Sequence, residues 1–125
     1  MATEFTVKVP DRPGQLGMLT SALGEAGVQL RGIGGNKGTI GILVADKDTA
    51  KARRALKKAG YRAKEQKAVE VRMQDKPGSL SRSAKRFGKA KVNISSVYVL
   101  APGRGSVGVA YSVKDARGAK RALGR

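Results

Sequence analysis

Apolar and polar residues alternate over two short segments of the chain, residues 5–9 and 69–73. Alternation with a period of two predicts a strand with one buried face. Behind each segment, apolar residues recur every three or four positions, which predicts a helix with one apolar stripe. The stripe comprises Leu16, Leu19, Leu23 and Ala26 in the first case, and Leu80, Ala84, Phe87 and Ala90 in the second.

A hairpin and a second helix are expected after each strand–helix pair. The second strands start at Val28 and Val92, glycine-rich loose loops fall at 34–38 and 101–105, and the third strands cover 39–45 and 106–113. The next helix is expected over 48–59 with Asp48 or Thr49 as its cap, and its counterpart near Asp115. Residues 61–65 can form a fourth strand, for which the second half has no equivalent.

The two halves are an internal repeat. A hexad of Asp, a basic residue, Pro, Gly, any residue and Leu starts at Asp11 and again at Asp75, and further matches follow in the same order. The order strand-helix-strand-strand-helix-strand predicts an α+β fold of two ferredoxin-like units, residues 1–66 and 67–125. Because the second unit lacks its last strand, we expect another chain or the first unit to cover the open sheet edge.

The composition argues against catalysis. The chain has no Cys and no His, which excludes thiolate chemistry, histidine-based catalysis and the usual zinc sites. Its nine carboxylates form no acidic cluster, so we expect no metal and no cofactor. The longest apolar run is too short to span a bilayer, and no secretion signal precedes the first strand. The sequence therefore predicts a non-enzymatic protein of the cytoplasm without a membrane partner.

The net charge of +17 has two interpretations. A basic excess of this size favours anionic partners, nucleic acid among them. A soluble, self-repelling surface would show the same excess.

The repeated Asp-x-Pro-Gly-x-Leu turn after a first strand, with Val-Asn-Ile at 92–94 opening a second strand, resembles the ACT domain. Over nearly its whole length the chain is similar to a stand-alone tandem ACT protein. The resemblance implies a regulatory module that binds an amino acid or similar small carboxylate effector at the interface between paired units. It also implies a homodimer, with an enzyme or another regulator as a further partner.

The hexads are the expected effector-binding corners. Pro favours a sharp entry into a helix, and Gly lets a ligand approach the backbone. The helix N-terminus then offers unpaired N–H groups and a partial positive charge, which suit a carboxylate. Asp11 and Asp75 are expected to cap the turn by accepting backbone N–H bonds. The predicted ligand-binding residues are Asp11, Pro13, Gly14, Gln15 and Leu16 in the first hexad, and Asp75, Pro77, Gly78, Ser79 and Leu80 in the second.

Two further ligand-binding residues follow from the resemblance. Asn93 holds the characteristic second-strand position of the family, and Gln29 takes that place in the first unit. Gly27 is replaced by Lys91 in the second unit, so the two half-sites are expected to be unequal. A structural interpretation stays open for all these residues, because any strand-to-helix turn needs such a corner and Asn is common in turns.

Glycines also gather between residues 32 and 38, but the run matches neither G-x-G-x-x-G nor G-x-x-x-x-G-K-[ST]. It lies between two predicted strands, so a flexible hairpin loop is the better interpretation. By the resemblance, this loop can still fold near the ligand.

Basic residues concentrate on three predicted helices and provide an alternative function. They are Lys51, Arg53, Arg54, Lys57 and Lys58, then Arg82, Lys85, Arg86, Lys89 and Lys91, and finally Arg117, Lys120 and Arg121. Such a helical face can bind nucleic-acid phosphates without reading sequence, although a solvated helix face has the same pattern. Base stacking is not supported, because the first and third strands hold only Phe5 and Tyr111 as aromatic residues. A structural adaptor that pairs through the open strand edge is the third alternative.

Overall fold

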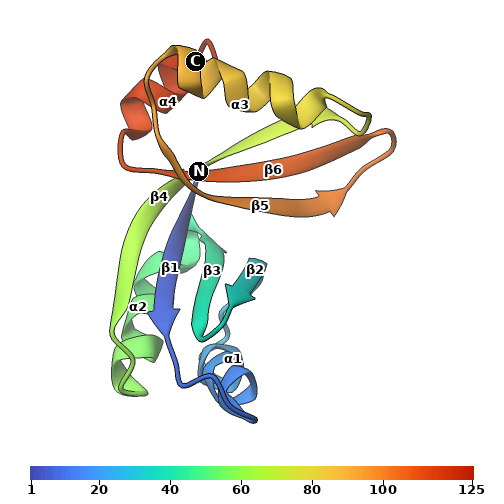
Figure 1. Cartoon of the computed structure of the whole chain (residues 1–125). Helices are drawn as coiled ribbons and strands as arrows, with labels where there is room; N and C mark the ends of the chain where they lie inside the picture. Colours follow the sequence, from blue (N-terminus) through green and yellow to red (C-terminus); the bar gives the residue numbers. More distant parts are fainter. The chain divides into compact units, whose positions relative to one another are not determined.

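The computed structural model describes residues 1–125, which form two compact units. The first unit is Ala2–Glu65, and the second is Gln66–Arg125 together with Met1. Both units run strand, helix, strand, strand, helix, so the fold is α+β as the repeat predicts (Figure 1). None of the helices is long and apolar enough to cross a membrane.

The first unit places two helices on an antiparallel sheet. Its elements are β1 (Ala2–Lys8), α1 (Gln15–Glu25), β2 (Leu30–Asn36), β3 (Thr39–Ala45), the 3-10 helix η1 (Asp46–Asp48), α2 (Thr49–Lys58) and the start of β4 (Ala63–Gln74). β3 pairs with both β1 and β2. Phe5 lies opposite Ile42, so alternation directs these apolar side chains to one face, where Leu19, Leu23 and Leu56 of the helices complete the core.

The second unit repeats this arrangement without a closing strand. It contains the rest of β4, then α3 (Ser79–Lys89), β5 (Ile94–Pro102), β6 (Ser106–Val113) and α4 (Ala116–Ala122). β6 pairs antiparallel with β4 and β5. In the core, the rings of Phe87 and Tyr111 pack with centroids 4.8 Å apart. The Tyr111 hydroxyl donates a 2.9 Å hydrogen bond to the Ser83 Oγ, which satisfies its buried polar end.

Strand boundaries differ from the expected ones at the junction between the repeats. The sequence predicts separate strands over 61–65 and 69–73, whereas β4 is one continuous strand. No Gly or Pro lies within β4 to interrupt the extended backbone. Val28 and Val92 are buried but precede β2 and β5, because their amides donate to the helix-end carbonyls of Leu23 and Phe87.

The first hairpin is tighter than predicted. A loose loop over 34–38 is wrong, because the strand β2 continues to Asn36 and only Lys37 and Gly38 connect it to β3. Both connecting residues have positive φ, 50° and 85°, as a two-residue turn of type I′ requires. The glycines before the turn therefore belong to a strand edge.

The predicted apolar stripes are buried in the middle but not at their ends. Leu19 and Phe87 are fully buried, whereas Leu16 is 55% exposed and Leu80 is 46% exposed. Both exposed leucines lie in the first turn of their helix, outside the core of their unit. Ala90 is also exposed, at the end of α3.

Candidate functional site

Each repeat enters its first helix through the same backbone corner. Gly14 and Gly78 are the N-caps of α1 and α3, with φ of 89° and 86°. This left-handed conformation is one that glycine adopts without steric cost. Both N-caps are glycines, which have no side chain, and no hydrogen bond to the side chain of Asp11 or Asp75 is found, so the expected capping by these aspartates is wrong. The backbone of a glycine, rather than an aspartate, turns the chain into the helix.

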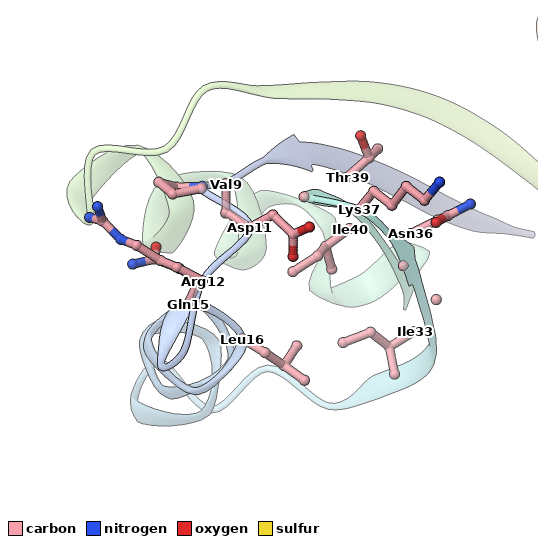
Figure 2. Close-up of a pocket in the computed structure, with 14 residues that line it drawn as sticks. Val9, Asp11, Arg12, Gln15, Leu16, Ile33, Asn36, Lys37, Thr39 and Ile40 are labelled. Atoms are coloured by element: carbon pink, nitrogen blue, oxygen red, sulfur yellow. The ribbon is translucent and has the colours of Figure 1, made fainter.

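In the first unit, the corner faces the β2–β3 hairpin across a cavity of about 420 Å³ (Figure 2). The corner contributes Val9, Pro10, Asp11, Arg12, Gln15 and Leu16, and the hairpin contributes residues 33–40. Pockets for small ligands usually span about 300–1,000 Å³, so this cavity is large enough for a small molecule.

One carboxylate and several apolar side chains point into the cavity. Figure 2 shows the side chains of Asp11, Leu16, Ile33 and Ile40 turned toward its interior. Ile33 is 44% exposed, so apolar surface is accessible to a ligand there. No three Cys, His, Asp or Glu side chains gather anywhere in the structure to hold a metal ion. The interior thus offers one negative charge beside aliphatic surface.

The N-terminus of α1 adds hydrogen-bond donors on the same side. The Met18 amide donates to the Gly14 carbonyl at 3.1 Å and so begins the ladder of the helix. The preceding amides of Gln15 and Leu16 have no acceptor within the helix. Both residues line the cavity. Together with the helix dipole, these donors favour an anionic group at this wall.

The hairpin wall is fixed to the end of β1. The Val9 amide donates a 2.7 Å hydrogen bond to the Gly38 carbonyl in the hairpin turn. Within the hairpin, β2 lies close to β3, because a Cβ on Gly35 would lie 3.2 Å from the Thr39 carbonyl oxygen. The two walls are therefore joined by backbone and are formed before any ligand arrives.

The matching corner of the second unit is occupied by an arginine side chain. Arg82 Nη2 donates to the Ser79 Oγ at 3.1 Å, and its Nη1 lies 3.0 Å from the position of a Cβ on Gly78. The Ser79 amide donates to the Lys76 carbonyl at 3.3 Å. At the start of α3, the Ser79 amide thus has an acceptor within its own unit. At the start of α1, by contrast, the residues with unpaired amides line a cavity.

The structure sorts the predicted ligand-binding residues into four groups. Asp11, Gln15 and Leu16 line the cavity, whereas Pro13 and Gly14 shape the corner without lining it. Asp75, Pro77, Gly78, Ser79 and Leu80 come together at the second corner, around the start of α3. Gln29 and Asn93 are exposed and precede their strands, and the Gln29 side chain donates to the Leu30 carbonyl at 3.2 Å.

Several cavity residues were not among those predicted to bind a ligand. They are Val9, Pro10 and Arg12 at the corner and residues 33–40 in the hairpin. The glycine-rich run was the available signal, because closely spaced glycines allow backbone segments to approach each other or a ligand. The sequence alone did not show that Ile33 and Ile40 would face Leu16.

The repeated fold, with its glycine corners and hairpins, also occurs in solved structures of regulatory subunits, in agreement with the ACT-like fold that the sequence predicts. The structure is similar to protein BT0572 from Bacteroides thetaiotaomicron, with a TM-score of 0.79 and 19% identity over 98% of this chain and 85% of that chain. It is also similar to the regulatory subunit of aspartate kinase from Thermus thermophilus, with a TM-score of 0.75 and 18% identity over 98% and 89% of the two chains. The corresponding subunit from Thermus flavus gives a TM-score of 0.69 and 18% identity over 98% and 90%. No family model and no curated protein matches the sequence.

Proposed function

We propose that the chain is a non-catalytic regulatory module that binds an amino acid, or a similar small carboxylate, in the cavity of its first unit. The observation that carries the proposal is that one cavity has both an inward-pointing carboxylate and the amide donors of a helix N-terminus on its walls. The Asp11 carboxylate points inward, and the amides of Gln15 and Leu16 lie at the wall where α1 begins. A zwitterionic amino acid complements both, with its ammonium group toward the carboxylate and its own carboxylate toward the helix N-terminus.

The remaining walls favour a ligand with an aliphatic part. Leu16, Ile33 and Ile40 line the cavity beside the charged positions, so an aliphatic side chain would remove apolar surface from water on both partners. We therefore expect amino acids with aliphatic carbons to bind more tightly than glycine.

Two features support a regulatory role shared with partner proteins. Two of the similar structures are regulatory subunits of aspartate kinase, and the one from Thermus thermophilus was solved in a ligand-free form. An enzyme is therefore the partner class that we propose. β2 is an edge strand in the strand order, and such edges pair readily with a second chain. A homodimer is thus the assembly that we propose.

A thermal-stability panel tests the effector proposal. The full chain is heated with each of the twenty amino acids, and a ligand that binds the folded state raises the midpoint according to its occupancy. Ile33→Glu places a second carboxylate at the cavity, which should repel the carboxylate of the ligand and abolish the shift. Val97→Glu is the matched control, because Val97 takes the equivalent place in β5 and is similarly exposed, 52% against 44%.

The panel has a clear negative outcome. If no amino acid shifts the midpoint of the wild-type chain, the effector proposal is wrong. An equal loss of the shift in both glutamate variants would place the binding site outside the cavity.

A further inference from the structure

The two repeats differ sharply in charge at matching positions of their first helices. Arg82, Lys85, Arg86 and Lys89 of α3 take the places that Met18, Ser21, Ala22 and Glu25 hold in α1. The two helices otherwise take the same place in their units, each packing one side against its own core. Since α1 folds without any cation, the four cations of α3 are not needed to build the helix.

The cations of α3 form one continuous stripe. At about 100° per residue, the four side chains fall within a sector of roughly 100° around the helix axis. All four are exposed, while Ser79, Ser83 and Phe87 on the inner side of the helix are buried. Neighbours at i+3 and i+4 within the stripe repel one another, which weakens the isolated helix. The stripe therefore opposes folding, and an external anion would relieve the repulsion.

The adjacent helix α4 extends the positive surface. α3 packs beside α4, and neither helix contains a carboxylate. A hollow of about 350 Å³ lies here, lined by Arg86, Lys89, Ala90 and Ala122. The nearest carboxylate in sequence, Asp115, accepts a 2.8 Å hydrogen bond from the Gly118 amide and caps α4. The exposed cations of α3 and α4 thus surround this hollow.

The basic helix of the first unit is partly neutralised, in contrast to α3. Arg53 of α2 donates two hydrogen bonds to the Glu65 carboxylate, at 2.6 and 2.7 Å. Lys51 lies 3.8 Å from a carboxylate oxygen of Asp48. The helical side of the second unit is therefore the more strongly positive of the two surfaces.

We propose that the α3–α4 face of the second unit binds the phosphate backbone of a nucleic-acid duplex, without reading its sequence. Regularly spaced cations complement the regularly spaced phosphates, and their binding releases condensed counterions. Stacking on single-stranded bases is not available on this face, because Phe87 and Tyr111 are buried in the core. This surface belongs to the second unit and shares no residue with the effector cavity of the first, so either proposal can fail without the other.

The same face lacks the features that a membrane surface requires. Membrane-binding helices carry cations on one side and large apolar side chains on the opposite side, and the apolar side chains enter the lipid. The inner side of α3 is instead buried in its own unit through Phe87. Leu80, at the start of α3, is its only exposed large apolar residue. Nucleic acid is therefore the polyanion that the surface fits best.

Fluorescence anisotropy with a labelled DNA duplex and the full chain tests this proposal. The test variant replaces Arg82, Lys85, Arg86 and Lys89 by Gln, and the control variant replaces Lys47, Arg54, Lys57 and Lys58 by Gln. Both remove the same charge from exposed positions. We expect the α3 variant to bind at least about tenfold more weakly at low salt. For this variant, the slope of log affinity against log salt concentration should decrease in magnitude by about one for each lost phosphate contact.

The control variant should retain most of the wild-type affinity, and duplexes of unrelated sequence should bind alike. Equal losses in both variants would mean attraction by net charge alone and would overturn the proposal. The proposal would also be wrong if the wild-type chain bound vesicles of anionic lipid or polyglutamate but no duplex. Thermal midpoints no lower than that of the wild-type chain in both variants show that loss of folding does not account for the difference, and relief of the repulsion should raise the midpoint of the α3 variant.

Discussion

A methyl group on Gly38 would lie 2.7 Å from the carbonyl oxygen of Val9. The two residues meet because the Val9 amide donates to the Gly38 carbonyl, which ties the hairpin turn to the end of β1. Gly38 also has a φ of 85°, so both the available space and the backbone conformation require glycine. This contact joins the two walls of the cavity, and the shape of the proposed effector site depends on it.

Gly38→Ala should therefore destabilise the chain and impair the cavity. The left-handed backbone costs about 1 kcal/mol and the steric overlap about 1–3 kcal/mol more, to be measured by urea unfolding. Gly105→Ala is the matched control in the second hairpin, where φ is 63° and no atom lies within 4 Å of an added Cβ. It should show the backbone cost alone. Equal costs for the two variants would show that Val9 yields to the methyl group.

Asp11→Asn should weaken amino-acid binding while leaving stability unchanged. The substitution keeps the shape of the side chain but removes the charge that we place opposite the ammonium group of the ligand. A charged hydrogen bond contributes about 1.5–3 kcal/mol, so calorimetry should show roughly a tenfold to hundredfold loss of affinity. The free energy of unfolding should hardly change, because Asp11 does not cap α1.

Asp75→Asn provides the comparison for this prediction. Asp75 takes the equivalent place in the second repeat, where Arg82 already occupies the corner. Its substitution should leave the affinity of the first unit unaltered. A similar loss in both variants would assign the effect to the overall charge of the protein instead of to a local contact.

The fold was accessible from the sequence because its signals are local and occur twice. Alternation around Phe5 and Val69, and the helical spacing of Leu19 with Leu23, depend on which face of an element is buried. The repeat then supplied each element with a second, independent example. The ends of the elements were less predictable. Leu16 follows the apolar spacing but lies in a first helix turn that extends past the core.

The candidate site was only half accessible from the sequence, because it depends on contacts between distant segments. The glycine corner at Gly14 has a local motif, and it is found where the motif places it. The opposite wall comes from residues about twenty positions later, and its approach depends on the pairing of β2 with β3. A type I′ turn at Lys37 and Gly38 sets that pairing, and the sequence pattern did not resolve it from a looser loop.

Lys91→Gly should stabilise the protein. Lys91 follows the end of α3 with a φ of 59°, in the place where Gly27 has a φ of 75° after α1. A lysine pays a steric cost in this left-handed conformation that a glycine does not. Relief of this strain should raise the free energy of unfolding by about 1 kcal/mol. The greater flexibility of glycine in the unfolded chain should offset part of this gain. Lys91→Ala removes the charge but keeps the Cβ, so it should give no comparable gain.

Ser83 and Tyr111 should behave as a coupled pair in a double-mutant cycle. The Tyr111 hydroxyl donates to the Ser83 Oγ at 2.9 Å, and both side chains are buried. Either Tyr111→Phe or Ser83→Ala leaves a buried hydroxyl without its partner, at a cost of about 1–3 kcal/mol. The double variant removes both hydroxyls and should cost clearly less than the sum of the single variants, as urea unfolding would show. Strictly additive costs would mean that this hydrogen bond does not contribute to the stability of the second core.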